Sequence, residues 1–490
     1  MRIHHDTRNT AAALLLPVTV ACAAAAPAAP YEATWESLDQ RPTPAWFQDA
    51  KFGIFIHWGV YAVPSWGPKG EYAENYAHWL YNVKRKDEVE FHRRVYGEDF
   101  PYKDFAPMFK AELFDPAAWA DIFARSGARY VVLTSKHTDS FALWPAPDTA
   151  QWNSTEVGPK QDLCGELTEA VRARGLRMGF YYCLLEWHNP YSTLYKDDVD
   201  RYVEQRLLPQ LKDLVLRYQP SVLWGDGEWD YPDTTWRSRE FLAWLFNEAP
   251  NRDEVAVNDR WTKEGRHQHG GYYTTEYGAG LKDTQHAWEE DRAIGHSFGY
   301  NRNESLADYR SGRELVLMLV DLVSRGGNLL LDIGPTADGR IPVIMEERLL
   351  QIGQWLEVNG DAIYATRPWQ TPCQWSAGTR PDFEFGKTYR AKYDINDITG
   401  RHDDGRAVVQ AFFTTKDGRL YAITPGWPGK TLRLTLPEAS GGATVRLLGY
   451  DGDLPWTYQN GTWVLDLSGI DPMTLPCQWA YAFELIRVGK

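Results

Sequence analysis

The sequence predicts a (β/α)8-like barrel, irregular in places, followed by an all-β sandwich domain. Between about residues 47 and 335, short apolar runs end in polar or aromatic residues and are separated by helical segments or long loops. Beyond about residue 366 the helical patterns stop, and short alternating runs follow one another. With 490 residues, the chain is long enough for a large barrel and a second module.

Eight apolar runs are the predicted barrel strands. They are Phe52–Trp58, Tyr130–Lys136, Met178–Cys183, Ser221–Trp224, Val255–Asn258, Gly271–Thr275, His296–Tyr300 and Asn328–Ile333. Two of the intervening helices carry clear end signals. One begins after Asp115 as N-cap, with Pro116 at its first position and Gly127 as its stop, and the other runs from Arg313 to Arg325. The sixth and seventh runs are weak and have little helix between them, so we expect the barrel to be irregular there.

The predicted sandwich occupies 366–490, after a barrel domain at 31–365. Turn signals separate its short apolar runs. The runs are Val408–Thr414, Leu420–Ile423, Leu432–Leu436, Val445–Leu448, Trp463–Leu467 and Trp479–Val488.

The first 30 residues have the pattern of a signal peptide. Arg2 and Arg8 form a basic region, residues 11–21 are apolar but too short to span a membrane, and small residues follow. The sequence therefore predicts export to the periplasm or the extracellular space, with no membrane-spanning segment. Cys22 is a loose match to a lipoprotein signal in which Thr19 fits poorly, so lipid anchoring at Cys22 is the less favoured alternative.

Charge and aromatic content narrow the class of partner. A net charge of −14 without a basic patch argues against DNA or RNA. The 22 tryptophans are typical of ring-stacking ligand sites or of a bulky core. Self-association into a homo-oligomer stays open.

The cysteines predict neither a disulfide framework nor a metal site. Their spacing is irregular, and no CxxC or His-rich pattern suggests a metal ligand set or a cofactor. Each of the four that follow the predicted leader is either bridged or free: Cys164, Cys183, Cys373 and Cys477.

Polar and aromatic residues follow the predicted strands, at the end of the barrel where active sites of this fold lie. The segment Leu223–Trp229 is the most informative, because Asp226 ends a buried strand among glycines and tryptophans. Aromatic faces stack on sugar rings, and a carboxylate can attack an anomeric carbon, so Asp226 is the candidate nucleophile of a glycosidase. The second carboxyl group that such an enzyme needs is either Glu276 or Glu289, which position alone does not separate.

Several motifs together resemble the glycoside hydrolase family 29 α-L-fucosidases over roughly residues 35 to 370. They are 46–59 (WFQDAKFGIFIHWG), 130–137 (YVVLTSKH), 223–227 (LWGDG), 257–261 (VNDRW), 297–301 (SFGYN) and 326–335 (GGNLLLDIGP). The resemblance implies a retaining exo-hydrolase that releases terminal α-L-fucose from glycans without a cofactor. It implies Asp226 as nucleophile and, from the pattern Thr274–Tyr277, Glu276 as acid/base, with Glu289 as the alternative. The sugar contacts that it implies are His57, Glu71, Tyr72, His137, Tyr182, Trp224, Arg260 and Phe298.

The chain departs from the family pattern at one sugar-binding position. Where the family commonly has Lys-His-His-Asp-Gly-Phe, this chain has Thr138 in place of the second histidine and Ser140 in place of the glycine. Tyr72 also stands where tryptophan is common. Because a hydroxyl reaches less far than an imidazole, an enzyme for a related sugar such as α-L-galactose is one alternative. A fucose-binding protein without activity is the other.

Overall fold

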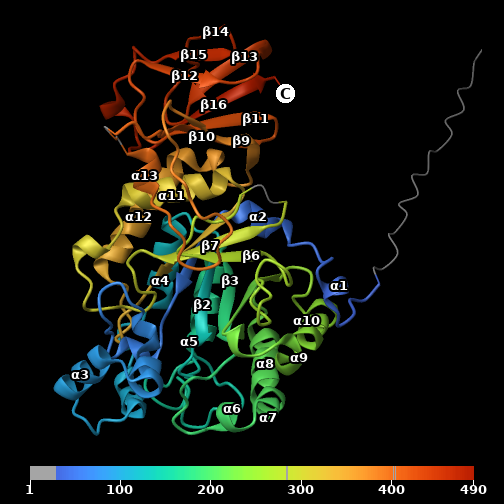
Figure 1. Ribbon diagram of the computed structural model, residues 1–490, viewed down its shortest axis with the longest axis vertical. Helices are drawn as coiled ribbons and strands as arrows, with labels where there is room; N and C mark the ends of the chain where they lie inside the picture. Colours follow the sequence, from blue (N-terminus) through green and yellow to red (C-terminus); the bar gives the residue numbers. More distant parts are fainter. Residues whose placement is uncertain (1–28, 283–284, 401, 403, 490) are drawn as a thin grey trace, which may run out of the picture.

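The computed structural model describes residues 29–282, 285–400, 402 and 404–489. A barrel occupies one end of the elongated molecule, and two antiparallel sheets, orange to red in Figure 1, occupy the other. The predicted signal peptide falls on residues 1–30, of which 1–28 lie outside the described residues.

Within the described residues, eight parallel strands form the barrel sheet, in the order β5-β4-β3-β2-β1-β8-β7-β6. The bounds are β1 Phe52–Ile56, β2 Tyr130–Lys136, β3 Arg177–Cys183, β4 Val222–Asp226, β5 Ala256–Val257, β6 Tyr273–Glu276, β7 Trp288–Ala293 and β8 Asn328–Ile333. The sheet curls so that its edges β5 and β6 meet through a short parallel bridge between Asn258 and Tyr272. The predicted (β/α)8-like architecture is therefore confirmed, with a narrow closure at this seam.

Helices cover the barrel unevenly. The longer ones are α3 Lys86–Val95, α4 Pro116–Arg125, α5 Leu163–Ala173, α8 Leu208–Tyr218, α10 Ser238–Asn247, α11 Gly312–Ser324 and α12 Val343–Asn359. The short ones are α1 Trp35–Leu38, α2 Ala45–Ala50, α6 Leu194–Asp197, α7 Val199–Tyr202, α9 Asp233–Trp236 and α13 Ile395–Thr399. The described parts of the β5–β6 and β6–β7 connections contain no α-helix, which is the irregularity that the sequence predicts.

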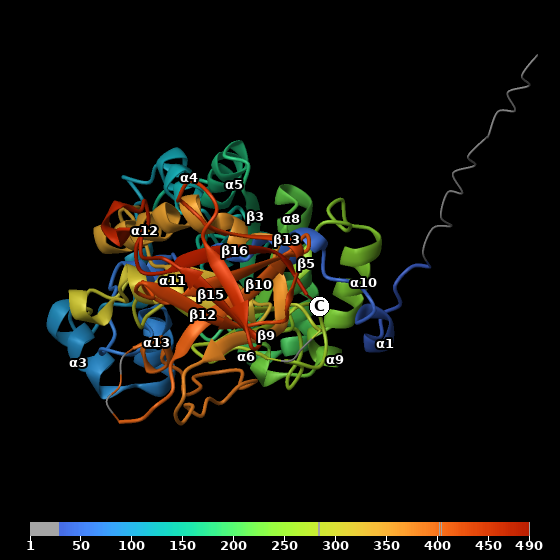
Figure 2. The same ribbon diagram turned by 90° about the horizontal axis from the view of Figure 1, so that it is seen from above.

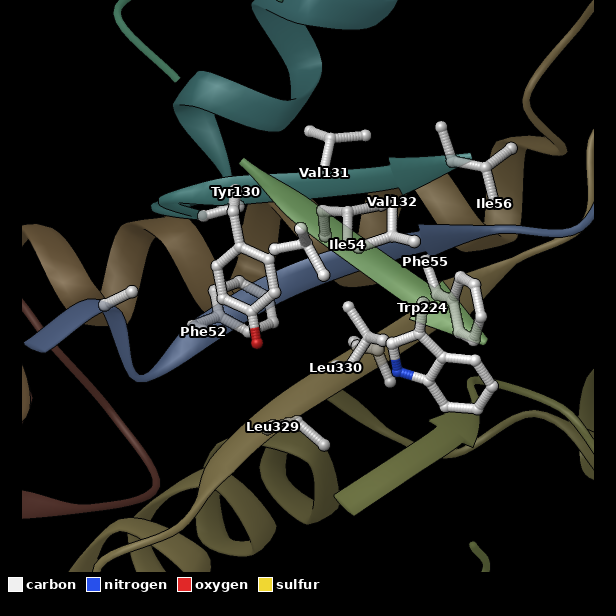
Figure 3. Packing of buried hydrophobic residues seen from close by; sticks show 14 of the residues in the cluster. Phe52, Ile54, Phe55, Ile56, Tyr130, Val131, Val132, Trp224, Leu329 and Leu330 are labelled. Carbon is white, nitrogen blue, oxygen red and sulfur yellow. The ribbon is translucent and has the colours of Figure 1, made fainter. Parts of the chain in front are cut away.

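The barrel core explains why its strands have continuous apolar runs. Both faces of β1, β2 and β8 are buried, so each side chain of Phe52–Ile56 packs against protein (Figure 3). The ring of Tyr130 crosses directly over Gly53, where a Cβ would lie 2.4 Å from the ring. A glycine at position 53 is therefore needed for the β1–β2 contact.

The seventh strand lies at a different place from the predicted His296–Tyr300. It is β7, whose sequence Trp-Glu-Glu-Asp-Arg-Ala carries four charged residues. Three of these four residues form buried ion pairs, for example Arg292 with Glu290 at 2.7 Å. Four consecutive charged residues make this fully buried strand look polar in the sequence. The residues predicted for the strand form a loop that follows it.

The C-terminal region contains a five-stranded and a three-stranded antiparallel sheet. Its strands are β9 Arg367–Trp375, β10 Val409–Lys416, β11 Arg419–Thr424, β12 Thr431–Thr435, β13 Ala439–Leu447, β14 Trp456–Gln459, β15 Thr462–Asp466 and β16 Tyr481–Val488. The region lies over α11 and α12, with Trp355 Nε1 donating to the Ala480 carbonyl at 2.9 Å (Figure 2). Between β9 and α13, segment 376–394 runs back beside β6 and β7 (Figure 1).

Candidate active site

A cavity of about 630 Å³ opens at the carboxyl ends of the barrel strands. This is the end at which barrels of this type carry their chemistry. The residues that line it are Phe55, His57, Tyr72, Glu74, Asn75, Trp79, His137, Thr138, Tyr181, Trp187, Trp224, Asp226, Glu228, Trp229, Arg260, Glu264, Arg266, Gln268, Glu276, Asp291, Phe298, Thr388 and Tyr389.

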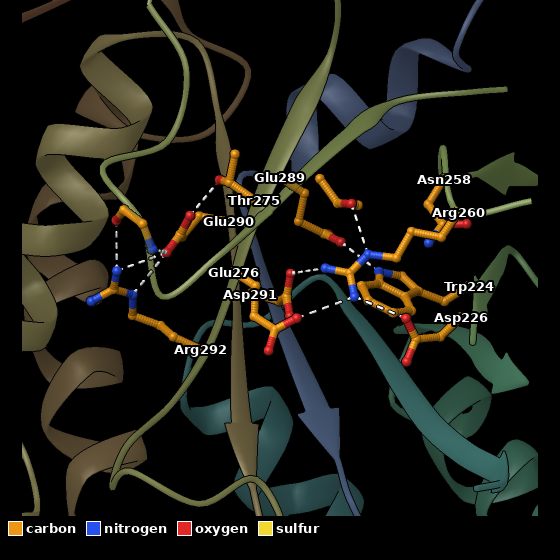
Figure 4. Close-up of polar contacts among 12 residues, drawn as sticks. Trp224, Asp226, Asn258, Arg260, Thr275, Glu276, Glu289, Glu290, Asp291 and Arg292 are labelled. Atoms are coloured by element: carbon orange, nitrogen blue, oxygen red, sulfur yellow. Dashed lines mark hydrogen bonds and ion pairs between the residues drawn. The ribbon is translucent and has the colours of Figure 1, made fainter. Parts of the chain in front are cut away.

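Arg260 joins the two candidate catalytic carboxylates (Figure 4). Its Nη1 lies 3.0 Å from Asp226 Oδ1 and 3.2 Å from Glu276 Oε2, so these two oxygens are no further apart than the sum of these distances. Retaining glycosidases hold their carboxyl groups about 5–5.5 Å apart, and inverting ones hold them about 6.5–9.5 Å apart. The upper bound for this oxygen pair lies below the inverting range and is compatible with the retaining arrangement.

The environment of Asp226 keeps it ionised. Burial raises the pKa of Asp226, but the attraction of Arg260 and Arg266 outweighs burial and leaves the pKa below its usual value. Tyr181 also donates its hydroxyl to Asp226 Oδ2 at 2.9 Å. A carboxylate that stays charged in a largely enclosed site can act as a nucleophile.

Glu276 is the last residue of β6, and its side chain enters the same cavity. Tyr72 donates its hydroxyl to Glu276 Oε1 at 2.9 Å. Burial raises the pKa of Tyr72, so this hydroxyl stays protonated and remains a donor. Glu276 is thus held on one oxygen by Tyr72 and on the other by Arg260.

Glu289, the alternative acid/base, lies outside the cavity. It is fully buried behind Trp224, whose Nε1 donates to Glu289 Oε1 at 3.0 Å, and Tyr130 donates to its other oxygen. Burial raises the pKa of Glu289 to about 7 despite these hydrogen bonds. Because the indole separates Glu289 from the cavity, the geometry favours Glu276.

Most of the predicted sugar contacts lie in the cavity: His57, Tyr72, His137, Trp224, Arg260 and Phe298. The rings of His57 and Phe298 are stacked with their centroids 4.8 Å apart. Burial, together with His137 and Arg260, lowers the pKa of His57 well below its usual value, so His57 is neutral. Its Nδ1 is 2.6 Å from Asp332 Oδ1, which fixes the ring orientation.

Two predicted contacts lie elsewhere. Tyr182 points away from the cavity, because successive side chains of a strand face opposite sides, and its hydroxyl donates to Gln210 at 2.8 Å. Its neighbour Tyr181 occupies the cavity instead. Glu71 is partly exposed and pairs with Arg85 at 3.3 Å, whereas Glu74, three residues later, reaches the cavity wall.

Thr138 lies on the cavity wall, where the family pattern has a histidine. Its Oγ1 is 3.2 Å from His137 Nδ1 and 3.3 Å from Asn75 Oδ1. The threonine hydroxyl therefore supports the neighbouring His137 ring in addition to lining the cavity.

Asp291 is a site residue that sequence reasoning missed. It accepts from Arg260 Nη2 at 3.1 Å and pairs in register with Glu276 across β6 and β7. Burial raises the pKa of Asp291 well above its usual value. Recognising the charged run around it as a strand would have found Asp291.

Three tryptophans also line the cavity: Trp79, Trp187 and Trp229. The centroids of Trp187 and Trp229 are 5.4 Å apart, and Trp229 is 38% exposed. Exposed indoles at the edge of a cavity suit further sugar rings beyond the one that enters.

The described ranges contain neither a metal-binding cluster nor a membrane-spanning helix. No group of three or more His, Cys, Asp or Glu residues there could hold a metal ion. None of the helices in those ranges is long and apolar enough to span a membrane. The four cysteines described, Cys164, Cys183, Cys373 and Cys477, are free.

Both main regions of the chain are similar to known proteins. Residues 18–361 match the family model for alpha-L-fucosidase, and residues 406–486 match that for the alpha-L-fucosidase C-terminal domain. The tissue alpha-L-fucosidase of Homo sapiens is 41% identical over 467 residues, covering 94% of this chain and 92% of that protein. An alpha-L-fucosidase of Branchiostoma floridae is 41% identical over 473 residues, covering 93% and 95% respectively.

Among solved structures, the chain is similar to the alpha-fucosidase of Thermotoga maritima in complex with a mechanism-based inhibitor. The TM-score is 0.75 at 36% identity, and the match covers 93% of this chain and 100% of that one.

Proposed function

This chain belongs to the α-L-fucosidases of glycoside hydrolase family 29, and we propose that it works by double displacement, with Asp226 as nucleophile and Glu276 as acid/base. The chain is a glycoside hydrolase that acts on fucosylated glycans and releases terminal α-L-fucose. The observation that carries the proposed mechanism is the placement of both carboxylates on one Arg260 nitrogen.

In the first step, an Asp226 oxygen attacks the anomeric carbon as the bond to the leaving oxygen breaks. Glu276 gives its proton to that oxygen, and a fucosyl–Asp226 ester forms. In the second step, Glu276 takes a proton from water, the water oxygen attacks the anomeric carbon, and Asp226 leaves as a carboxylate. Two inversions give net retention of configuration.

The remaining cavity residues support this assignment through sugar recognition. Trp224 and Phe298 present apolar faces to the ring and to the C6 methyl group that distinguishes fucose. The neutral His57 and His137 offer imidazole nitrogens to sugar hydroxyls. Because an apolar wall rejects an added hydroxyl only weakly, we expect an α-L-galactoside to be cleaved about 100-fold less efficiently.

The nucleophile is tested with Asp226→Gly and an activated aryl α-L-fucoside. We expect activity to be lost and azide to restore it, with formation of the inverted β-fucosyl azide. Glu228→Gln is the matched control, because Glu228 is a buried carboxyl of the same cavity that Arg266 holds at 2.7 Å. An active Asp226→Gly enzyme without azide contradicts the assignment.

The acid/base is tested with Glu276→Ala beside Glu289→Ala. We expect kcat/KM of Glu276→Ala to fall roughly 10²–10⁴-fold for poor leaving groups and little for good ones. If Glu289→Ala shows that dependence instead, Glu289 is the acid/base.

Export is also part of the proposal. The basic, apolar and small-residue pattern of residues 1–30 supports cleavage of a signal peptide on export to the periplasm or the extracellular space. N-terminal sequencing of the secreted protein tests this, and a mature protein that still begins at Met1 contradicts it.

A further inference from the structure

The β6 end of the barrel, which carries Glu276, has an unusual partner. On one side, β6 pairs with β7 in register, Glu276 opposite Asp291. On the other side, the barrel strand β5 reaches β6 only through the bridge at Tyr272, four residues before Glu276. An unpaired edge with free backbone groups would therefore flank the proposed acid/base.

Segment 383–393 of the C-terminal region fills this position. The Glu276 N–H donates to the Thr388 carbonyl at 3.0 Å, and the Arg390 N–H donates to the Glu276 carbonyl at 2.9 Å. These bonds make a parallel bridge between Glu276 and Tyr389. The segment thus adds a short strand to the open side of β6, at the residue whose carboxyl group must be placed accurately.

Side chains of the same segment reach the Glu276 carboxyl through Tyr72. Tyr389 lies beside the Tyr72 hydroxyl, which donates to Glu276 Oε1 at 2.9 Å. The Arg390 guanidinium lies over the Tyr72 ring, 4.8 Å from its centroid. Thr388 and Tyr389 also line the cavity on this side.

The segment is anchored at both ends to the barrel. Near its start, the Arg325 guanidinium, just after the end of α11, lies over the Phe385 ring, 5.3 Å from its centroid. The Gly386 N–H donates to the Gly280 carbonyl at 3.0 Å. At its end, the Tyr393 hydroxyl donates to Asp321 of α11 at 2.9 Å. These anchors allow the exposed middle of the segment to hold a defined position at the cavity.

We propose that segment 383–393 is a positioning element of the active site, which fixes Glu276 for proton transfer through the backbone of Thr388 and Arg390 and through the Tyr389–Tyr72 contact. The proposal rests on Glu276 as the acid/base. The leaving group departs on the side of the cavity where the acid protonates it. Tyr389 lines the cavity on this side, so it also contacts the leaving group.

Two substitutions at one position isolate the backbone contribution. Arg390 has a φ of 43°, which glycine adopts freely and proline cannot. Arg390→Gly keeps the N–H that bonds Glu276, whereas Arg390→Pro removes the N–H and the conformation. Both variants lose the guanidinium, so the difference between them reports the N–H of residue 390 together with the backbone conformation that aims it at Glu276.

The readout is kcat/KM for a series of aryl α-L-fucosides whose leaving groups range from dinitrophenyl to phenyl. Impaired proton donation lowers the rate for the poor leaving group only. We expect Arg390→Pro to be about 10-fold slower than Arg390→Gly on the phenyl fucoside and equal to it on the dinitrophenyl fucoside. Tyr389→Phe, which removes only the hydroxyl that meets Tyr72, should shift the dependence in the same direction.

Lys387→Ala is the control, because Lys387 lies in the segment but pairs outward with Glu384 at 3.3 Å. It should match the wild type with every leaving group. If Arg390→Pro is unfolded by thermal melting, Tyr389→Phe decides, and a wild-type dependence in that variant overturns the proposal.

Glu276→Ala, measured with the same substrates, distinguishes a failure of the acid/base assignment from a failure of the positioning role. If Glu276→Ala shows the leaving-group dependence but Arg390→Pro and Arg390→Gly are alike, the positioning role is wrong and the mechanism stands. If Glu276→Ala lacks that dependence, the acid/base assignment fails, and the positioning role fails with it.

Discussion

Removing the positive charge of Arg260 should move the acidic limb of the pH–rate profile upward. Arg260 is almost fully buried and contacts Asp226, Glu276 and Asp291 within 3.2 Å. In Arg260→Met, the burial that raises the pKa of Asp226 is no longer outweighed by this guanidinium. Asp226 must be ionised to attack, so activity is lost as the pH falls through its pKa, and a higher pKa places that loss at higher pH.

The size of the shift follows from the contact. At about 4 Å between charges and an effective dielectric constant of about 20, the attraction is about 4 kcal/mol, which corresponds to about 3 pKa units. Arg266 remains 3.6 Å from Asp226, so the carboxylate keeps one cationic partner. We therefore expect the limb to move up by up to about 3 units.

The assay is kcat/KM of a dinitrophenyl α-L-fucoside against pH, because this parameter reports the pKa values of the free enzyme. Arg292→Met is the matched control, since Arg292 is equally buried but pairs with Glu290 on the far side of β7. It should be destabilised to a similar degree without a shift of the limb. An acidic limb that stays in place in Arg260→Met, or moves equally in Arg292→Met, refutes the reasoning.

Three further outcomes follow from buried polar groups and cysteines. Because the folded-state pKa of Glu289 is raised to about 7 from 4.5, its contribution to stability is full below pH 4.5 and is lost as the pH rises to about 7. Glu289→Gln, which is neutral at every pH, should flatten the dependence of Tm on pH in this window, by up to about 3 kcal/mol in the free energy of unfolding; an unchanged slope contradicts this. Thr138→Val removes the hydroxyl that contacts His137 Nδ1, so kcat/KM should fall about 2–10-fold, which corresponds to the loss of one hydrogen bond. An unchanged kcat/KM would show that this contact does not contribute to activity. Since the described cysteines are free, a reducing agent should leave Tm unchanged, and a lowered Tm would reveal a bridge.

The sequence predicted those parts of the molecule in which local pattern and tertiary environment agree. Continuous apolar runs such as Phe52–Ile56 read as buried strands because the barrel buries both of their faces. The helix after Asp115 was predictable from its cap, and Asp115 Oδ1 does accept from the Ala118 N–H at 3.0 Å. The positions of Asp226 and Arg260 at strand ends were enough to predict that both lie at one site, although their side-chain contacts were not known.

Prediction failed where tertiary contacts override the local pattern. Strand β7 looks polar in the sequence because it has four charged residues in a row. Its burial becomes understandable only from tertiary contacts with groups far away in the sequence, such as the ion pair of Asp291 with Arg260. The choice between Tyr181 and Tyr182 depends on the phase of the strand, which a run of buried residues does not reveal. The contribution of Thr388 and Tyr389 depends on a contact more than 100 residues away from Glu276, for which no local signal exists.

The return of segment 383–393 to the barrel has a consequence for how this protein can be cut or recombined. A shortened chain that ends near residue 365 would retain every barrel strand and still lack the backbone groups that meet Glu276. Chimeras that exchange the C-terminal region between homologues would exchange part of the reaction centre with it. The part of the chain needed for activity is therefore larger than the barrel domain. A minimal catalytic fragment must extend at least through Tyr393.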